Sequence, residues 1–357
     1  MARALRLAER GRYTAHPNPV VGCVLVNDGA VVGEGWHQVS GEAHAEVNAL
    51  QAAGIKSRGA TAYVTLEPCS HHGKTPPCAE ALIAAGVERV IVAMQDPHQA
   101  VAGGGLRLLT EAGITVQTGL MESDAAALNP GFLKRVTAHR PFVRLKLATS
   151  LDGATAMANG ESQWITGLEA RADVHRLRAR SGAIMTGIGT VLSDDPSLTV
   201  RAKDIETNGL QPLRVVLDSK LRMPLAAGML TLPGTTLVCC AGDLDKSRLE
   251  AANAEVMSFS ADEGGVSVDE VLQELATRGV NEVLVEAGAR LAGHLLDNDW
   301  VDELVIYQAP HIMGSQTMRL VDTPSWTSLA DRKSLNITDV RRIGSDTRIT
   351  ATPSQKN

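Results

Sequence analysis

The 357-residue sequence is poor in aromatic residues, which make up only 3% of the chain, so its cores must be built mainly from Val, Leu, Ile and Ala. No apolar run approaches the roughly 18 residues that a membrane-spanning helix needs. The N-terminus reads as an amphipathic helix and lacks the apolar stretch of a secretory signal. Basic blocks are also missing, and the formal net charge of -6 argues against a nucleic-acid partner. These absences predict a cytoplasmic protein with no membrane-bound segment.

Cysteine is scarce as well. An odd number of cysteines without a secretory signal does not suggest a disulfide framework. The five cysteines are Cys23, Cys69, Cys78, Cys239 and Cys240.

Length and patterning predict two α/β domains. Single domains mostly contain about 100–200 residues, and the 44% hydrophobic content is enough for two cores. A polar stretch at 135–140, followed by Pro141, predicts the boundary between a domain at 1–140 and one at 141–357. Strands joined by helices in the first part predict a mainly parallel sheet covered on both faces.

The expected elements follow from hydrophobic periodicity and from glycine or proline breaks. In the first part, we expect a hairpin at 20–32, helices at 44–53, 78–85 and 103–112, and strands at 62–66, 89–93 and 114–118. In the second part, we expect strands at 142–147, 183–186, 214–218, 236–240, 282–286 and 303–309, and helices at 168–180, 268–277 and 288–296.

The strongest chemical signal combines His44 and Glu46 with Cys69 and Cys78. One imidazole and two thiolates suit Zn²⁺ and leave a fourth position for water. Zinc lowers the pKa of such a water to ~7, so that it can attack a ring carbon bearing an amino group. Glu46 lies two residues from His44 at a helix start, where it can transfer protons without being a ligand. The pattern therefore predicts a zinc-dependent deaminase.

Simpler interpretations of these residues remain open at this point. A buried cysteine is usually a small hydrophobe, and a lone histidine is more often a structural polar residue than a metal ligand. The general signature of zinc deaminases places two residues between the cysteines, whereas eight separate Cys69 from Cys78 here. His71 or His72 could also complete a closed structural site with four ligands.

Four motifs in the first part resemble the bacterial riboflavin-pathway deaminase family, which carries the same eight-residue insertion. They are His16-Pro-Asn18-Pro-Val-Val-Gly22-Cys-Val, Gly33-Glu-Gly-Trp-His37, Gly41-Glu-Ala-His44-Ala-Glu46 and Leu66-Glu-Pro-Cys69-Ser-His-His-Gly-Lys74-Thr-Pro-Pro-Cys78. The resemblance implies a cytidine-deaminase-like fold, in which Asn18 contacts the pyrimidine. It also implies that His37, His71 and Lys74 line the ribose-phosphate side. Family members begin a few residues upstream of their first helix, whereas this chain starts almost on it.

The second part lacks the G-x-G-x-x-G fingerprint of a Rossmann fold and the Lys-Ser/Thr of a P-loop. Glycine turns follow two expected strands, at 187–190 and 286–294, and the second opens a helix whose free N–H groups could bind a phosphate. Such turns are common in α/β proteins, so alone they are weak signals.

Several motifs in this second part resemble the reductase of the same pathway, from about Pro141 nearly to the C-terminus. They are Leu145-Lys-Leu-Ala148-Thr-Ser-Leu-Asp152-Gly153, Gly160-Glu-Ser162-Gln-Trp164-Ile-Thr166, His175-x-x-Arg178, Gly187-Ile-Gly-Thr190-Val-Leu-Ser-Asp194-Asp195-Pro-Ser-Leu198-Thr-Val-Arg201 and Val285-Glu286-Ala-Gly288. The resemblance implies a dihydrofolate-reductase-like fold, the cofactor NADPH, and a phosphoribosyl substrate whose sugar is reduced to a ribityl chain. It also implies a homodimer or homotetramer.

The same resemblance assigns residues to two ligands. NADPH would contact Ala148, Trp164, Thr190, Asp194 and the turn Gly288, Ala289, Arg290, Leu291, Ala292, Gly293 and His294. The substrate would contact Ser162, Arg178, Leu198, Arg201 and Glu286. Arg178 and Arg201 can each bind a phosphate bidentately. The simpler interpretation is that both form ordinary ion pairs at the surface. An isolated tryptophan such as Trp164 is more often a core residue, and Lys146 is expected to face the site without an assigned step.

The sequence therefore predicts a bifunctional riboflavin-biosynthesis enzyme acting on a small pyrimidine ribotide. Its first half would hydrolytically remove an amino group, and its second half would reduce the ribosyl group with NADPH. One alternative is a polynucleotide-editing zinc deaminase with a C-terminal nucleic-acid-binding module, which the net charge and scarce aromatics oppose. Another is a zinc-binding scaffold without activity, which would have no need of Glu46.

Overall fold

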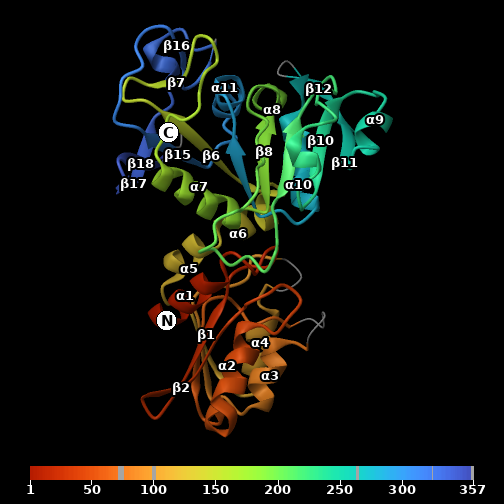
Figure 1. The fold of residues 1–357 in the computed structure, drawn as a ribbon. Coiled ribbons are helices and arrows are strands. Elements are labelled where there is room, and N and C mark those ends of the chain that lie inside the picture. The colour runs from red at the N-terminus through yellow and green to blue at the C-terminus, as the bar shows by residue number, and fades with distance from the viewer. Residues whose placement is uncertain (71–75, 99–101, 263–264, 324, 355–357) are drawn as a thin grey trace. The chain divides into compact units, whose positions relative to one another are not determined.

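The computed structural model describes residues 1–70, 76–98, 102–262, 265–323 and 325–354, and it divides into two compact units. The first unit comprises Met1–Arg140 with Glu206–Asn208, and the second comprises Pro141–Ile205 and Gly209–Asn357 (Figure 1). The polar stretch expected to mark the domain boundary is helical as far as Ala138, because helix α6 (Pro130–Ala138) begins at Pro130 and continues through it. Proline is favoured at the first position of a helix, where its missing N–H costs nothing.

The first unit is built on one mixed sheet of five strands in the order β2-β1-β3-β4-β5. The strands are β1 (Gly22–Asn27), β2 (Ala30–Trp36), β3 (Thr61–Val64), β4 (Arg89–Val92) and β5 (Thr115–Thr118). β1 pairs antiparallel with both β2 and β3, whereas β4 pairs parallel with β3 and β5. The expected hairpin is confirmed, with Asp28 and Gly29 both at positive φ in its turn. The expectation of a mainly parallel sheet was wrong for this unit, because β1 pairs antiparallel on both of its sides and so makes two of the four described pairings antiparallel.

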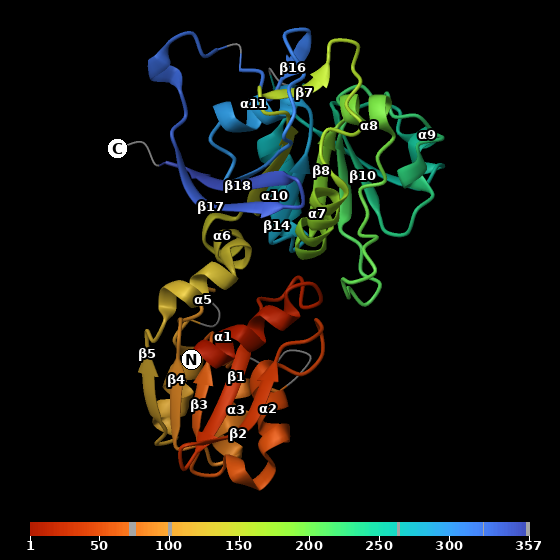
Figure 2. The same ribbon diagram turned by 60° about the vertical axis from the view of Figure 1, so that its left-hand side comes forward.

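Helices cover both faces of this sheet, as Figure 2 shows. Alternate residues of β1 point to opposite sides, so Cys23 and Leu25 pack in one core while Val24 packs in another. The first core contains α2 (Ala45–Ala53), α3 (Cys78–Ala84) and α4 (Gly104–Glu111). The other face carries α1 (Ala2–Ala8) and α5 (Glu122–Leu128).

Two glycines in β2 allow α2 to lie unusually close to the sheet. A Cβ atom at Gly33 would lie 2.3 Å from the carbonyl oxygen of Ala49, and one at Gly35 would lie 2.3 Å from that of Ala45. Any larger residue would push the helix away. The glycines therefore fix the position of the helix whose N-terminus carries His44 and Glu46.

The second unit contains a nine-stranded sheet in the order β11-β10-β9-β8-β14-β6-β15-β18-β17. Its strands are β6 (Phe142–Thr149), β8 (Ala183–Gly187), β9 (Leu213–Leu217), β10 (Thr236–Ala241), β11 (Ala254–Phe259), β14 (Glu282–Glu286), β15 (Glu303–Gln308), β17 (Leu335–Ile343) and β18 (Asp346–Pro353). The strands from β11 to β15 are parallel, and β18 and β17 add antiparallel at one edge. Two small ribbons pair β16 (Thr317–Arg319) with β7 (Ala154–Met157) and β12 (Ala261–Asp262) with β13 (Gly265–Val266).

The second sheet also lies between two helical layers. One core joins α10 (Val268–Thr277) and α11 (Ala289–Asp297) to residues such as Leu145 and Val285. The opposite core joins α7 (Leu168–Arg180), α8 (Ile188–Asp194) and α9 (Ser247–Glu250) to residues such as Ile184 and Leu284. Every parallel strand except β6 thus contributes alternate side chains to both cores, as expected for a sheet covered on both faces. β6 gives its apolar residues to the first core and places Arg144 and Lys146 on the opposite face.

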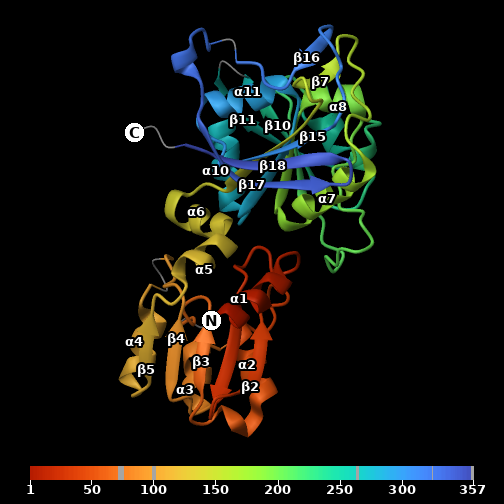
Figure 3. The ribbon, with the colours of Figure 1, turned by 90° about the vertical axis from the view of Figure 1, so that its left-hand side faces the viewer.

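The sequence patterns did not predict several elements of the second unit. The glycine turn expected at 187–190 is the start of α8, and the hairpin of β17 and β18 was not foreseen. The two strands lie side by side in Figure 3. Most of β17 is exposed, so it lacks the apolar alternation that reveals a half-buried strand. Within the described ranges, no helix is long and apolar enough to cross a membrane.

Candidate functional site

His44, Cys69 and Cys78 come together in the first unit, as the sequence predicts. His44 is the N-cap of α2, Cys69 lies in the loop after β3, and Cys78 is the first residue of α3. The Nδ1 atom of His44 lies 3.2 Å from the sulfur of Cys78 and 3.6 Å from that of Cys69. The three ligand atoms lie within 4.8 Å of one another. A tetrahedral zinc ion with bonds of about 2.0 and 2.3 Å holds its nitrogen and sulfur ligands about 3.5 Å apart, so this arrangement fits the ion.

The ionisation of the two thiols is coupled. A hydrogen bond with the thiol of Cys78 lowers the pKa of Cys69 to about 4, and His44 acts in the same direction. The same bond, together with burial, raises the pKa of Cys78. The backbone N–H of Cys78 also donates to the sulfur of Cys69, at 3.3 Å. The site therefore already favours one thiolate, and a bound zinc ion would hold both sulfurs deprotonated.

Glu46 is buried beside these ligands in the first turn of α2, with 3% of its surface exposed. Burial raises the pKa of Glu46 to about 7, because a low-dielectric environment disfavours the charged carboxylate. Its carboxyl group also hydrogen-bonds with Cys78. A carboxyl group with a pKa near neutrality can both accept and return a proton, which is what a general acid and base requires.

Asn18 and His37 lie next to the candidate metal site. The Nε2 atom of His37 is 3.0 Å from the side-chain nitrogen of Asn18, and its Nδ1 is 3.2 Å from the carbonyl oxygen of Ala43. Burial lowers the pKa of His37, which favours a neutral ring that donates to Ala43 and accepts from Asn18. The ring meets that of His44 edge to face at 5.2 Å. Within the part of the chain that the structure describes, the side-chain oxygen of Asn18 has no hydrogen bond, so it can accept one from a ligand.

The loop that precedes β1 and carries Asn18 is held in place by a residue that the sequence analysis did not identify. The side chain of Asn129 accepts from the N–H of Val20 at 2.8 Å and donates to its carbonyl oxygen at 2.9 Å. Its pairing with a residue more than a hundred positions away gives no sequence pattern. The two remaining residues expected on the phosphate side, His71 and Lys74, lie outside the described residues.

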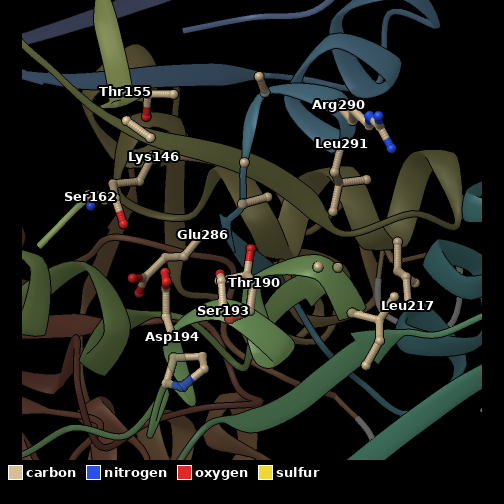
Figure 4. A pocket seen from close by; sticks show the side chains of 18 of the residues that line it. Lys146, Thr155, Ser162, Thr190, Ser193, Asp194, Leu217, Glu286, Arg290 and Leu291 are labelled. Atoms are coloured by element: carbon tan, nitrogen blue, oxygen red, sulfur yellow. Dashed lines mark hydrogen bonds between the residues drawn. The ribbon is translucent and has the colours of Figure 1, made fainter. Parts of the chain in front are cut away.

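A large pocket lies in the second unit at the carboxyl ends of its parallel strands. It has a volume of about 2170 Å³, whereas pockets for single small molecules have volumes of about 300–1,000 Å³. Open α/β sheets bind their ligands at this edge of the sheet. Figure 4 shows Lys146 of β6, Glu286 of β14, Thr190 and Asp194 of α8, and Arg290 of α11 around the hollow. The pocket is large enough for a dinucleotide and a second ligand together.

The residues expected to bind the cofactor and the substrate gather in this pocket, with one exception. Those lining it are Ala148, Ser162, Trp164, Arg178, Thr190, Asp194, Leu198, Arg201, Glu286, Gly288, Ala289, Arg290, Leu291, Gly293 and His294. Ala292 does not line it, because its side chain is buried in the core beneath α11. The core position considered for Trp164 was wrong, since its side chain is 69% exposed and Arg171 stacks 4.3 Å from the centre of its ring.

A buried charge cluster lies at the centre of the pocket. The guanidinium of Arg178 donates two hydrogen bonds to the Glu286 carboxylate, at 2.6 and 2.9 Å, and a third to the carbonyl oxygen of Thr199 at 3.0 Å. Burial opposes ionisation of Glu286, but attraction to Arg178 and Lys146 outweighs it and lowers its pKa. Burial lowers the pKa of Lys146. Arg178 is therefore ion-paired with Glu286, whereas the side chain of Arg201 has no hydrogen bond or ion pair within the described ranges.

The pocket also fits a cofactor with phosphate groups. A Cβ atom at Gly189 or Gly288 would meet nothing within 4 Å, so both glycines leave open space at the start of helices. Gly288 is the N-cap of α11, whose first N–H groups and positive dipole end favour an anion. Sequence reasoning missed Ser219, Lys220 and Arg222, which line the pocket just after β9. A cationic pair following a strand was the only available signal.

Comparison with known families assigns both halves of the chain. The cytidine and deoxycytidylate deaminase zinc-binding region matches residues 1–94, and the RibD C-terminal domain matches residues 141–349. The first match agrees with the zinc-like arrangement of His44, Cys69 and Cys78.

Curated relatives match over almost the whole chain. The riboflavin biosynthesis protein RibD of Escherichia coli (strain K12) is 50% identical over 355 residues, covering 97% of this chain and 96% of that protein. The RibD protein of Bacillus amyloliquefaciens is 42% identical over 358 residues, covering 99% and 95%. These relatives do not favour the alternative of a polynucleotide-editing deaminase.

Solved structures agree with the relatives. Acinetobacter baumannii RibD, in its form 2, has a TM-score of 0.92 at 43% identity and covers 99% of this chain and 97% of its own. A diaminohydroxyphosphoribosylaminopyrimidine deaminase/5-amino-6-(5-phosphoribosylamino)uracil reductase from Thermotoga maritima has a TM-score of 0.84 at 33% identity, with coverage of 99% and 97%. The expected α/β fold, cytidine-deaminase-like in the first half and reductase-like in the second, is therefore confirmed. The chain belongs to the RibD family and is a bifunctional deaminase and reductase of riboflavin biosynthesis.

Proposed function

We propose that the two reactions are divided between the two units and follow one another on the same ribotide. The first unit hydrolyses the 2-amino group of 2,5-diamino-6-ribosylamino-4(3H)-pyrimidinone 5′-phosphate and releases ammonia. The second unit reduces the ribosyl group of the resulting 5-amino-6-(5-phosphoribosylamino)uracil to ribityl. The name of the Thermotoga maritima neighbour states these two substrates for that protein.

In the first unit, His44, Cys69 and Cys78 hold one zinc ion. When bound, zinc supplies an acidified water as a nucleophile at neutral pH. Asn18 orients the pyrimidine through its free side-chain oxygen, and the neutral ring of His37 holds Asn18 in place. Glu46 accepts a proton and passes it to the departing amine, for which its raised pKa is suited. His37, His71 and Lys74 contribute to the ribose-phosphate side.

In the second unit, residues along the α8 and α11 side of the pocket would hold NADPH, which would supply the hydride. Ala148, Trp164, Thr190 and Asp194 line its path together with the helix start from Gly288 to His294, where Ala292 supports the turn from the core. Ser162, Leu198 and Arg201 contact the phosphoribosyl substrate. Arg178 and Glu286 form a fixed pair next to Lys146, so a carboxylate and an ammonium face the reacting sugar.

The preference for NADPH over NADH is proposed to come from Lys220 and Arg222. NADPH differs from NADH by a 2′-phosphate, and cationic side chains recognise such a group through charge-assisted hydrogen bonds. Both residues line the pocket directly after β9, with Ser219 beside them.

The experiment that tests the division of labour follows ammonia release and NADPH absorbance together on purified protein. With the diamino-ribotide and NADPH, both signals are expected, and omission of NADPH should leave only ammonia. Ammonia without NADPH oxidation would contradict the role of the second unit. Absence of both signals from folded, zinc-loaded protein would contradict the proposed substrate. A homodimer or homotetramer stays a prediction, which light scattering of the purified chain would check.

A further inference from the structure

The carboxylate of Glu67 is buried between β3 and α4, two residues before the zinc ligand Cys69. Only 4% of Glu67 is exposed. One of its oxygens accepts hydrogen bonds from the N–H groups of Asp96 and Gly103, at 3.2 and 3.1 Å. The other accepts from Gly105 and Leu106, at 3.0 and 3.4 Å. Four backbone donors therefore surround one carboxylate.

These bonds cap helix α4 from outside its own sequence. The N-cap position of α4 is Gly103, which has no side chain to accept from the first turn. A side-chain oxygen at an N-cap normally satisfies the N–H groups of the second or third helical residue. Glu67 accepts from these two residues, Gly105 and Leu106, and its negative charge lies at the positive end of the helix dipole.

The chain around Cys69 also packs closely against the first turn of α4. A Cβ atom at Gly105 would lie 1.9 Å from the carbonyl oxygen of Pro68, and one at Gly104 would lie 2.5 Å from the hydroxyl of Ser70. Pro68 and Ser70 flank Cys69 on either side. The Pro68–Cys69–Ser70 segment therefore packs directly against the first turn of α4.

The Pro68–Cys69–Ser70 segment is also hydrogen-bonded to the start of α3, where Cys78 lies. The N–H of Ala79 donates to the carbonyl oxygen of Cys69 at 3.2 Å, and the N–H of Cys78 donates to its sulfur. α3, which begins at Cys78, shares a hydrophobic core with α4 through Leu82 and Leu109. A shift of the segment at Glu67 would move the sulfur of Cys69 directly. It would also loosen the contact of that sulfur with Cys78.

We infer that Glu67 is a positioning residue of the metal site, which fixes the sulfur of Cys69 by anchoring the Pro68–Cys69–Ser70 segment to the N-terminus of α4. Its two oxygens are occupied by backbone N–H groups, so it is not a metal ligand and takes no part in proton transfer. The inference rests on the proposed zinc site of His44, Cys69 and Cys78. Groups that orient metal ligands from outside typically change metal affinity or activity by about 10–100-fold when they are replaced.

The test replaces Glu67 by Gln in the full-length chain and measures zinc affinity by competition with a chromogenic chelator. The amide keeps the shape but turns a donor toward N–H groups that need acceptors, so we expect zinc to bind about 10-fold or more weakly. The deaminase kcat should fall while the KM for the ribotide stays near that of the parent, because Asn18 and His37 lie elsewhere. The matched control is Glu111→Gln, which removes an exposed carboxylate from the other end of α4 and should change neither value.

A purely structural role would give a different pattern. In that case Glu67→Gln would lower the melting temperature of the zinc-free and zinc-loaded protein equally and leave zinc affinity within about twofold, which would overturn the inference. Should Glu67→Gln fail to fold, Glu67→Asp decides instead, because the shorter carboxylate keeps the charge but cannot reach the N–H groups of Asp96, Gly103, Gly105 and Leu106 together. Weakened zinc binding supports the inference and unchanged binding overturns it. Failure of the parent chain to bind zinc would contradict the proposed function rather than the role of Glu67.

Discussion

The surroundings of two largely buried carboxylates, one in each unit, shift their pKa values in opposite directions. For Glu46, burial outweighs the attraction of His44 and raises its pKa to about 7. Glu286 is largely buried, but the bidentate contact with Arg178 and the charge of Lys146 lower its pKa. The first group is suited to exchange protons at neutral pH, and the second to remain a fixed negative charge.

Replacing Glu46 by Gln is expected to abolish deamination and to retain zinc. The amide cannot exchange a proton, and loss of general acid–base catalysis typically costs about 10²–10⁴ in rate. Ammonia release and zinc content by atomic absorption are the measurements. Glu42→Gln is the matched control, because it removes an exposed carboxylate two residues before His44 and should leave both values unchanged. Normal turnover by Glu46→Gln would contradict the mechanism.

Replacing Lys220 and Arg222 by Ala should reduce the preference for NADPH. A charge-assisted hydrogen bond contributes about 1.5–3 kcal/mol, so the ratio of kcat/KM for NADPH to that for NADH should fall roughly 10–100-fold. The measurement is the steady-state reductase rate with each cofactor. Lys203→Ala, an exposed change outside the pocket, should leave the ratio as it is. An unchanged ratio in the double variant would exclude these two residues as the 2′-phosphate contacts.

At the scale of elements, the amino ends of three adjacent strands are joined by a buried charge cluster. Arg144 of β6 pairs with Glu282 at the start of β14 and with Glu303 at the start of β15. Arg180, the last residue of α7, also contacts Glu282, at 3.1 Å. Burial alone would raise the pKa of Glu282, but Arg180 and Arg144 lower it to about 2.

This cluster predicts how the second unit responds to acid. Because the pKa of Glu282 is lower in the folded protein, its stabilising effect is complete above about pH 4.5 and is lost as the pH falls toward about 2. The lost free energy of unfolding is on the order of 3 kcal/mol. Urea titrations followed by tryptophan fluorescence measure it, since Trp164, Trp300 and Trp326 belong to this unit.

The comparison is made with Glu282→Gln. This variant should be less stable at pH 7 by about 3 kcal/mol and should lose less stability than the parent between pH 4.5 and 2. The control is Glu255→Gln, which breaks the more exposed pair with Arg278 and should cost no more than about 1 kcal/mol. Equal acid sensitivity in the parent and Glu282→Gln would contradict the assignment.

At the scale of the whole molecule, each unit has its own sheet, cores and candidate site. Among the described residues, the candidate metal cluster draws only on the first unit and the large pocket only on the second. We therefore expect the two activities to be lost separately.

Removal of zinc by a chelator should abolish ammonia release while the already deaminated ribotide is still reduced by NADPH. Both rates are measured on the same sample before and after dialysis, and added zinc should restore the first. Parallel loss of both activities would show that the second unit also depends on the metal. A mock dialysis without chelator is the control.

The sequence by itself determined the two-part α/β organisation, most strands and helices, and the three residues that gather in the candidate metal site. These features depend on local periodicity, on turn residues and on chemically distinctive side chains. The tertiary structure alone decided what depends on contacts between distant segments. Examples are the hydrogen bonds of Asn129 with the backbone of Val20, the capping of α4 by Glu67, the pairing of Arg178 with Glu286, and the exposed hairpin of β17 and β18. A carboxylate or an amide looks the same in sequence whether it is solvated or buried, because its partners and its pKa are fixed only when the chain folds around it.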